Sequence, residues 1–452
     1  MKKIISLFLV LPFFCLAQCW EKISISATHS LAIKSNGTLW AWGDNSYGQI
    51  GDGTFIDRAT PIQIGSDTDW TDLAAATQTS LALKANGTLW SWGRNDFGQL
   101  GDGTFINKNM PIQIGTDTNW SSIDSNPSGY HFQALKTNGT LWVWGLNTTG
   151  QCGDGTLINK NVPTQVGNGN TWISVKGGGS YTLAIKADNT LWGWGSNSFG
   201  QLGDGTTTNR SLPVAIGNNT DWSAFEAGTF HSLAIKNNGT LWGWGRNNAG
   251  QLGIGITASK TLPTQIGSLD NWSKIAAGSE FSMAIKQDGT IWSWGFNNNG
   301  QLGDGTLVSK TAPQQMGTLS NWEDIIINGY RSTAINADGT LFSWGLNNDG
   351  QIGDGSFVTR TTPTAIDCGP LSTNDLEEYS DFILFPNPVS NELNINSKYE
   401  IESISIFNLL GVKVAHHNGD EKSIYVGNLP KGIYILELIS NDTKLYKKFT
   451  KK

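Results

Sequence analysis

A pair of tryptophans followed by glycine recurs along most of the chain. Its first copy is Leu39-Trp40-Ala41-Trp42-Gly43, and the tract Gly48-Gln49-Ile50-Gly51 follows it. Successive copies lie 50 residues apart, except for one spacing of 52 residues. The first tryptophan of the pair lies at Trp40, Trp90, Trp142, Trp192, Trp242 and Trp292, and Phe342 takes the seventh place. Seven copies at this period predict one repeat array rather than several independent domains.

Each repeat contains four segments with the alternation of β-strands. In the first repeat these are residues 20–27, 30–34, 38–43 and 61–65. Asn36-Gly37 joins the second segment to the third, and such a pair between alternating runs is a strong hairpin signal. Four short strands every 50 residues are typical of a propeller blade, which buries its faces by stacking on its neighbours. We therefore expect an all-β, seven-bladed β-propeller with four-stranded blades, whose repeats start near residues 20, 70, 120, 172, 222, 272 and 322.

The array opens with the first strand of a repeat and ends with a last strand, so whole repeats should form whole blades. Trp40 and Trp42 are two residues apart on one strand and therefore point to one face. A Trp side chain buries about 150–250 Å². We expect both rings to lie between blades, as packing groups rather than as a ligand platform.

The repeat resembles the regulator of chromosome condensation repeat, a family of seven-bladed propellers. The fifth repeat carries the matching motifs, Ala-Gly-Thr-Phe-His-Ser-Leu-Ala-Ile at 227–235, Thr-Leu-Trp-Gly-Trp-Gly at 240–245 and Gly-Gln-Leu-Gly at 250–253. The resemblance covers about residues 20 to 367. Known members of this family have two roles: nucleotide exchange on a nuclear small GTPase, and inhibition of β-lactamases by a secreted bacterial propeller. The first does not suit an exported protein, and nothing in the chain marks β-lactamase as the target of the second.

The N-terminus predicts export. Lys2 and Lys3 precede an apolar run over 4–14, and Ala17 ends a small-residue cleavage site, so residues 1–17 are interpreted as a signal peptide. A lipoprotein with Cys19 as the acceptor is the alternative, which Gln18 disfavours. No other segment is apolar enough to span a membrane. The propeller should then occupy residues 18–367, with a linker over 368–380.

A different pattern begins after the linker. Short alternating segments with turn residues over 381–452 predict a small C-terminal β-sandwich. The opening Phe-Pro-Asn-Pro at 385–388, Leu-Pro-Lys-Gly-Ile-Tyr at 429–434 and the terminal lysines closely resemble the type A sorting domain of the type IX secretion system. The resemblance implies a Bacteroidota-type organism and the secretion machinery as a partner of residues 382–452. It also implies a secreted protein or one at the outer-membrane surface.

Composition and motifs argue against several functions. A net charge of −7 and a pI of about 5.3, without a basic stripe, argue against nucleic-acid binding. The repeated Asp of the Gly-Asp-Gly tract, such as Asp52, is interpreted as capping its own turn rather than binding calcium. The sequence has no nucleophile–base set, no phosphate loop and no Cys/His cluster with metal spacing. We therefore expect no enzyme, no cofactor and no metal site, and we expect a monomer.

A variable residue pair precedes each Leu-Ala-Ile strand. Propeller geometry brings these connections together on one face, and Tyr, Phe, His and Arg include types that binding hot spots favour. We hypothesise a recognition face. Its alternative is a set of half-buried loop residues without a ligand, and the His residues lie in alternate blades, which disfavours a zinc site. The pairs are Thr28 and His29, Gln78 and Thr79, Tyr130 and His131, Ser180 and Tyr181, Phe230 and His231, Glu280 and Phe281, and Tyr330 and Arg331.

Three cysteines remain after the predicted cleavage. Cys19 and Cys368 flank the array, so a disulfide between them could tie its ends, and two free thiols are equally open. Cys152 takes a place filled by Leu or Ile in other repeats, which predicts a buried thiol. Together these features favour a secreted binding or scaffold protein that recognises another macromolecule, a protein or a glycan. The alternatives are an extracellular hydrolase or carbohydrate-active enzyme that uses the ring face, and a structural adhesin component.

Overall fold

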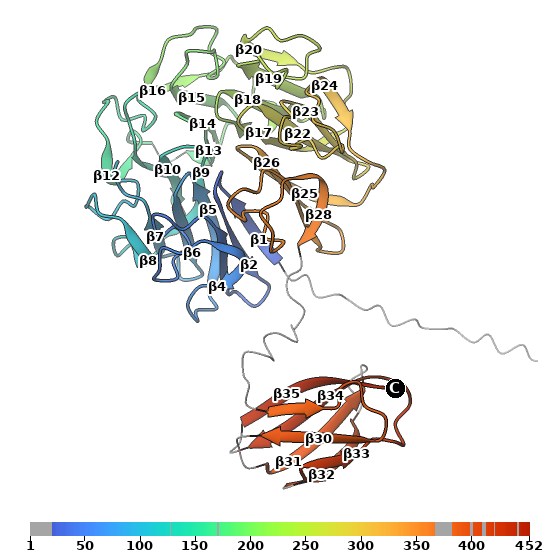
Figure 1. Cartoon of the computed structure of the whole chain (residues 1–452). Helices are drawn as coiled ribbons and strands as arrows, with labels where there is room; N and C mark the ends of the chain where they lie inside the picture. Colours follow the sequence, from blue (N-terminus) through green and yellow to red (C-terminus); the bar gives the residue numbers. More distant parts are fainter. Residues whose placement is uncertain are drawn as a thin grey trace, which may run out of the picture. The chain divides into compact units, whose positions relative to one another are not determined.

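The computed structural model describes residues 20–126, 128–169, 171–366, 382–397, 401–408, 413–419, 421–440 and 443–452. The chain divides into two compact units, residues 1–368 and 369–452. The first unit is a ring of blades (Figure 1). The predicted signal peptide, the linker, Cys19 and Cys368 lie outside the described residues, so the proposed disulfide stays a prediction.

Seven four-stranded antiparallel sheets form the ring, each with its strands in sequence order. This confirms the predicted seven-bladed propeller. The blades contain, in order, β1 (Trp20–Ile25), β2 (His29–Lys34), β3 (Leu39–Gly43) and β4 (Arg58–Gln63); β5 (Trp70–Ala76), β6 (Thr79–Lys84), β7 (Leu89–Gly93) and β8 (Lys108–Gln113); β9 (Trp120–Ser125), β10 (His131–Lys136), β11 (Leu141–Gly145) and β12 (Lys160–Gln165); β13 (Trp172–Gly177), β14 (Tyr181–Lys186), β15 (Leu191–Gly195) and β16 (Arg210–Ala215); β17 (Trp222–Ala227), β18 (His231–Lys236), β19 (Leu241–Gly245) and β20 (Lys260–Gln265); β21 (Trp272–Ala277), β22 (Phe281–Lys286), β23 (Ile291–Gly295) and β24 (Lys310–Gln315); β25 (Trp322–Asn328), β26 (Arg331–Asn336), β27 (Leu341–Gly345) and β28 (Arg360–Ile366).

Side chains at the strand ends fix the connections within a blade. In the β2–β3 hairpin, Asn36 Oδ1 accepts hydrogen bonds from the amide of Thr38 at 3.2 Å and its hydroxyl at 2.6 Å. Gly37 has a φ of 76°, and a Cβ there would lie 2.0 Å from the carbonyl oxygen of Thr68. The predicted Asn-Gly turn therefore needs glycine both for its backbone conformation and for its contact with the next connection.

One backbone carbonyl accepts hydrogen bonds from the next blade at every interface. The Gln49 carbonyl of blade 1 accepts hydrogen bonds from Trp92 Nε1 at 2.8 Å and Ser80 Oγ at 2.7 Å, both in blade 2. Gly51 packs under the same ring, because a Cβ there would lie 2.7 Å from Trp92 Nε1. The second tryptophan of the pair donates to the preceding blade's Gln carbonyl at all seven interfaces. The repeated Trp-Gly and Gly-Gln motifs are therefore the two halves of one inter-blade contact.

The first tryptophan of the pair differs from the expectation. The Trp40 ring is only half-buried, and its Nε1 donates to Thr38 Oγ1 of the same blade at 2.9 Å. Lys34 Nζ lies 3.5 Å from the ring centroid, and Trp20 meets the ring edge-on at 6.1 Å. Only the second ring is fully enclosed between blades, as Trp92 illustrates with 0% exposure. The first ring faces the hairpin end of its blade, where lysine covers it.

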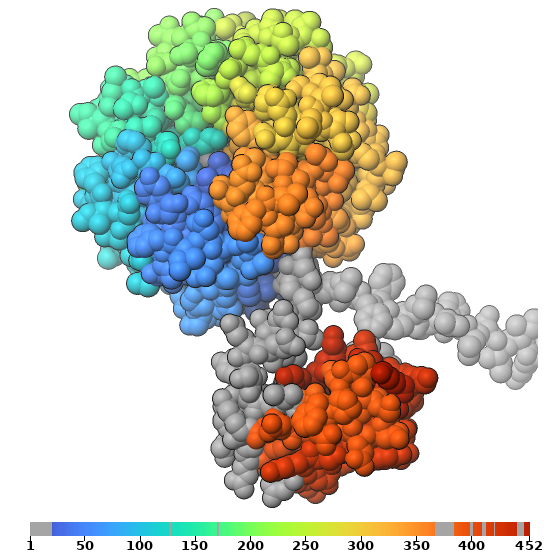
Figure 2. Space-filling model, viewed as in Figure 1, coloured from blue at the N-terminus to red at the C-terminus, as the bar shows by residue number. Residues whose placement is uncertain are grey.

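The ring closes with whole blades, as the phase of the repeats predicts. A hydrophobic cluster contains Trp20, Ile25 and Trp42 of blade 1 together with Leu341 and Ile352 of blade 7. Figure 2 shows these first and last blades in contact, in blue and orange. No blade shares strands from both ends of the array in the described part of the chain.

A buried arginine spans this closing interface. Arg331 is 1% exposed and lies at the start of β26. Its Nε and Nη2 donate to the Ser26 carbonyl at 3.2 and 3.1 Å, and Nη2 also donates to the His29 carbonyl at 2.7 Å. Nη1 donates to the Gln351 carbonyl. One blade 7 side chain therefore donates to carbonyls on both sides of the junction, which the five N–H donors of a guanidinium make possible.

The single 52-residue spacing has a structural consequence. The additional residues fall in the connection from β9 to β10 of blade 3. Asn126 Nδ2 donates to the Ala227 carbonyl of blade 5 at 3.0 Å. Ser128 Oγ lies 3.3 Å from Ser279 Oγ of blade 6 and 3.4 Å from Asn328 Oδ1 of blade 7. This connection therefore crosses the centre of the ring at the end of the strands where β1 leads to β2.

The second unit contains two small sheets. They are formed by β29 (Phe382–Phe385), β30 (Glu392–Ser397) and β33 (Ser423–Tyr425), and by β31 (Ser403–Asn408), β32 (Lys413–Asn418), β34 (Gly432–Ser440) and β35 (Thr443–Lys451). One core draws on both sheets, including Leu393 and Ile424 of the first and Ile404, Leu436 and Phe449 of the second. The predicted small β-sandwich is confirmed. Across the described ranges, no helix is long and apolar enough to cross a membrane.

Candidate functional site: the loop face of the propeller

Two sets of connections lie at the same end of every blade. Because the strands run antiparallel in sequence order, the β1–β2 and β3–β4 connections of a blade share one end, and the tight hairpins lie at the other. We call the end that carries β1–β2, β3–β4 and their equivalents the loop face. It contains the variable residue pairs that the sequence singles out.

The second residue of each pair lies inside the ring. Each opens the second strand of its blade and is 0–1% exposed, so these side chains have no surface for direct contact with a partner. The alternation of β2 turns this residue towards the neighbouring blade, which the sequence hypothesis did not anticipate. The seven are His29, Thr79, His131, Tyr181, His231, Phe281 and Arg331.

Several of these buried residues bond the next blade. His29 Nε2 lies 2.9 Å from Ser80 Oγ, and His231 Nε2 lies 2.8 Å from Ser282 Oγ. The hydroxyl of Tyr181 donates to the His231 carbonyl at 2.7 Å. Burial lowers the pKa of His231 to about 3 and that of His131 to about 4. Both rings are therefore neutral at physiological pH and form contacts with the neighbouring blade.

The first residue of each pair stays at the surface. Thr28, Gln78, Tyr130, Ser180, Phe230 and Glu280 are half-buried, and Tyr330 is exposed. Thr28 Oγ1 donates to the Thr77 carbonyl at 3.1 Å, and the Ser180 carbonyl accepts from Thr149 Oγ1 at 3.0 Å. These two residues fasten loops to one another. The aromatic and amide members instead join residues of the β3–β4-type connections in clusters.

The Arg94 cluster spans blades 1 to 3. It consists of Tyr47, Gln78, Arg94, Phe97 and Tyr130. The Arg94 guanidinium carbon lies 5.0 Å from the Tyr47 ring centroid and 5.4 Å from that of Tyr130. Tyr130 meets Phe97 edge-on at 5.3 Å, and Arg94 Nη1 donates to Gln78 Oε1 at 2.8 Å. A guanidinium is thus held among three half-buried rings, in the geometry that cation–π attraction favours.

The Arg246 cluster repeats this arrangement in blades 4 to 6. It consists of Phe199, Phe230, Arg246 and Glu280. The Arg246 guanidinium carbon lies 5.2 and 5.4 Å from the Phe199 and Phe230 ring centroids, and the rings meet edge-on at 5.6 Å. Arg246 Nη1 pairs with Glu280 Oε1 at 3.0 Å, whereas its buried Nε has no partner in the protein. This guanidinium therefore keeps an unused donor.

The sequence hypothesis missed three of the five residues in the Arg94 cluster and two of the four in the Arg246 cluster. Tyr47, Arg94, Phe97, Phe199 and Arg246 follow the Trp-Gly motif by one or four residues. Residue types vary at these two places while the flanking Trp-Gly and Gly-Gln tracts repeat. The same variability that selected the β1–β2 pairs could have selected them.

The described residues include no group of three or more His, Cys, Asp or Glu side chains that could hold a metal ion. The repeated Asp is engaged in its own turn: Asp52 Oδ1 accepts from the amide of Thr54 at 2.9 Å, and Oδ2 accepts from Arg58 Nε at 2.9 Å. Cys152 is 1% exposed, as predicted, and burial raises the pKa of its thiol. The contacts resolved on the loop face therefore come mainly from the aromatic and cationic side chains of the two clusters.

Comparison with known proteins assigns the propeller to a family. Two overlapping matches to the model of the RCC1-like domain cover residues 12–235 and 131–324. The chain belongs to the RCC1-like domain family. A further match, to the regulator of chromosome condensation (RCC1) repeat, covers residues 338–374. The resemblance drawn from the Trp-Gly and Gly-Gln motifs is thereby confirmed.

Solved structures agree with the RCC1-like fold. Human WBSCR16 superposes with a TM-score of 0.66 at 19% identity, covering 73% of this chain and 94% of that protein. Prp20p from Saccharomyces cerevisiae gives a TM-score of 0.65 at 20% identity, covering 78% and 90%. At these identities the likeness concerns the fold alone.

The C-terminal unit matches the secretion system C-terminal sorting domain over residues 383–452. This RCC1-like protein is therefore a substrate of type IX secretion, delivered outside the cell or to its surface. A curated relative, the ulvan lyase NLR42 of Nonlabens ulvanivorans, is 32% identical over 76 residues, which is 16% of this chain and 14% of that enzyme. The chain thus matches only a small part of the lyase.

Proposed function

We propose that this secreted propeller is a binding protein whose loop face recognises another macromolecule outside the cell, a protein or a glycan. The observation that carries the proposal is the pair of arginine–aromatic clusters on that face. Tyr and Arg are enriched where interfaces concentrate their binding energy. Rings and guanidinium groups that already pack together also lose little conformational freedom on binding.

The clusters are accessible as well as ordered. The side chains of Arg94 and Arg246 are 21% and 24% exposed, and that of Glu280 is 21% exposed. The partly exposed Arg246 guanidinium and Glu280 carboxylate could each receive a polar group of a partner. Both clusters lie on the loop face, so one partner could contact both.

The test is capture of a partner from the producing organism's medium, with the mature protein immobilised. Arg94→Ala, Tyr130→Ala, Phe230→Ala and Arg246→Ala together should reduce capture at least tenfold. The buried His131 and His231 are left intact, because changing them would test stability instead. A control with Phe105→Ala and Phe357→Ala removes rings that are 56% and 58% exposed outside both clusters. Undiminished capture by the fourfold variant would refute the proposal, and loss only in the control would move the interface to that surface.

The enzymatic alternative has its own readout. A hydrolase or carbohydrate-active enzyme should release product from a panel of glycans and peptides with catalytic turnover. A binding protein should instead saturate at one partner per propeller. The similarity to the ulvan lyase covers only 16% of this chain.

A further inference from the structure

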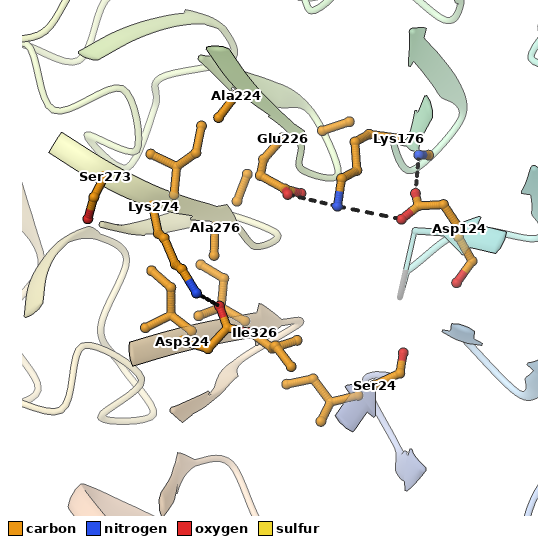
Figure 3. Close-up of a pocket in the computed structure, with 18 residues that line it drawn as sticks. Ser24, Asp124, Lys176, Ala224, Glu226, Ser273, Lys274, Ala276, Asp324 and Ile326 are labelled. Carbon is orange, nitrogen blue, oxygen red and sulfur yellow. Dashed lines mark hydrogen bonds and ion pairs between the residues drawn. The ribbon is translucent and has the colours of Figure 1, made fainter. Parts of the chain in front are cut away.

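A pocket occupies the centre of the ring, apart from the clusters of the loop face. Its volume is about 340 Å³, within the range that small-molecule sites occupy. The first strands of blades 1 and 3 to 7 line it, and Figure 3 shows Asp124, Lys176 and Glu226 converging on one side. Lys274 and Asp324 lie on another side, from blades 6 and 7.

The blade 3 connection closes one end of this pocket. Asn126 reaches the Ala227 carbonyl across the ring, and Ser128 reaches Ser279 and Asn328. At the opposite end, Lys274 and Asp324 are both 49% exposed. The pocket is therefore blind, with its opening on the hairpin side.

The charges in the pocket do not balance. Five charged side chains line it, three carboxylates and two ammonium groups. Lys274 Nζ pairs with Asp324 Oδ1 at 3.2 Å. Lys176 Nζ lies 2.8 Å from Glu226 Oε1 and 3.7 Å from Asp124 Oδ1, so one cation serves two carboxylates. One negative charge is left without a counter-charge in the protein.

The excess negative charge of the pocket affects the pKa of Asp124. Its Oδ2 accepts a hydrogen bond from the amide of Gly177 at 2.7 Å. Burial raises the pKa of Asp124 to about 7; Lys176 opposes this shift, while Glu226 and Asp72 add to it. Asp72 itself is paired with Lys22 at 2.6 Å. Near neutral pH a proton thus partly neutralises the extra charge.

Apolar side chains form part of the remaining wall. They include Ile25, Ala224, Ala276 and Ile326, whereas polar atoms make up most of the accessible lining. A ligand that complements the pocket therefore needs one positive group for the carboxylates and a small body that tolerates a mixed polar and apolar wall. We propose that the blind central pocket binds a small organic monocation, a primary ammonium group on a short aliphatic chain, with the ammonium beside Asp124 and Glu226. This site is independent of the loop face.

The experiment is a calorimetric titration of the full-length protein with n-butylammonium, with n-butanol and butyrate as neutral and anionic probes of similar size. We expect saturable binding of one butylammonium per chain and none of butyrate. Asp124→Asn should weaken binding at least tenfold. Asp349→Asn makes the same charge change at a half-buried site outside the pocket and should leave binding unchanged.

Two further measurements keep the result decisive. Affinity should fall about tenfold between pH 8 and pH 6, because a proton competes for Asp124. If Asp124→Asn fails to fold, Glu226→Gln removes the second carboxylate and should weaken binding in the same way. Absence of saturation, equal binding of butanol, or equal affinity in Asp124→Asn and Asp349→Asn would overturn the proposal.

Discussion

At the scale of single residues, the two tryptophans of each repeat have different tasks. Trp194 is 0% exposed and donates to the Gln151 carbonyl of the preceding blade at 3.0 Å. Trp192 is half-buried and donates to Thr190 of its own blade at 2.8 Å. Truncating the first ring of the pair should therefore leave blade contacts largely in place, whereas truncating the second should open a cavity between blades.

We predict that Trp194→Ala destabilises the propeller by about 3–5 kcal/mol, the cost typical of removing a buried aromatic ring. Trp192→Ala should cost less than half as much, because solvent and Lys186 already cover that ring. Thermal unfolding of the two variants, followed by tryptophan fluorescence, measures the difference. Equal losses would show that both rings contribute equally to the blade interface.

The buried histidines predict how stability depends on pH. Ser282 gives its hydroxyl proton to the Gln251 carbonyl at 2.8 Å, so His231 Nε2 must carry a proton and donate to Ser282. Its Nδ1 has no partner, which suits a neutral ring. Because burial lowers the pKa of His231 to about 3 in the folded protein, protonation below pH 6.5 favours the unfolded chain.

This residue should therefore have no pH-dependent effect above pH 6.5 and should cost stability as the pH falls from 6.5 towards 3. We predict that His231→Gln is less stable than the native protein at pH 7.5 but loses about 2–3 kcal/mol less between pH 7.5 and 4.5. Urea unfolding at the two pH values gives the comparison, with Thr79→Ser as a buried control that does not titrate. Equal losses of unfolding free energy in His231→Gln and the native protein would contradict a lowered pKa for His231.

At the scale of strands and connections, local patterns predicted what lies within a blade. Asn36-Gly37 determined a hairpin, and alternation located β2 and β3. The fourth strand begins at Arg58, three residues before the predicted segment, because Gly43 pairs with Arg58 across a bulge. Whether His29 faces solvent or the next blade depends on the residue at which β2 begins. Contacts such as Tyr47 with Arg94 join different blades, so their assembly could be recognised only in the folded ring.

Closure of the ring depends on two elements that are distant in sequence, β1–β2 and β25–β26. Arg331 supplies the donors that join them, and its replacement by Leu would leave the Ser26, His29 and Gln351 carbonyls without that partner. The Gln351 carbonyl would keep Trp42 Nε1 as a donor and the His29 carbonyl would keep the Ser26 amide. The Ser26 carbonyl would lose the arginine donors, and an unpaired buried acceptor costs about 1–3 kcal/mol. We predict that Arg331→Leu opens the junction between blades 7 and 1 before the rest of the ring.

Hydrogen exchange followed by mass spectrometry locates such an opening. Peptides from β1, β2, β25 and β26 should exchange at least tenfold faster in Arg331→Leu, while those from β13 to β16 should stay unchanged. Phe281→Leu is the matched control at the equivalent place in blade 6. Uniform acceleration over all seven blades would mean that the arginine stabilises the ring globally rather than its junction.

At the scale of the whole molecule, each unit has a hydrophobic core of its own. The inter-blade clusters consist of propeller residues, and the sandwich core consists of residues between Leu384 and Phe449. The 28 strands of the propeller end at Ile366, before the second unit begins. Export and recognition can therefore be separated: the sorting domain directs the chain across the outer membrane, and the propeller carries the proposed binding surface.

Removal of residues 381–452 tests this division. Because the propeller cores need no residue of the second unit, the truncated protein should fold and show an unfolding midpoint within about 2 °C of that of the propeller in the full chain. It should nevertheless accumulate in the periplasm instead of reaching the medium or the cell surface, since the matched sorting domain spans 383–452.

Cell fractionation with immunoblotting measures its location, and a full-length chain carrying the exposed-site change Tyr425→Ser controls for altered expression. A truncated propeller that is folded but trapped would separate sorting from folding. Its normal appearance in the medium would instead place the export signal within the propeller or the N-terminal segment.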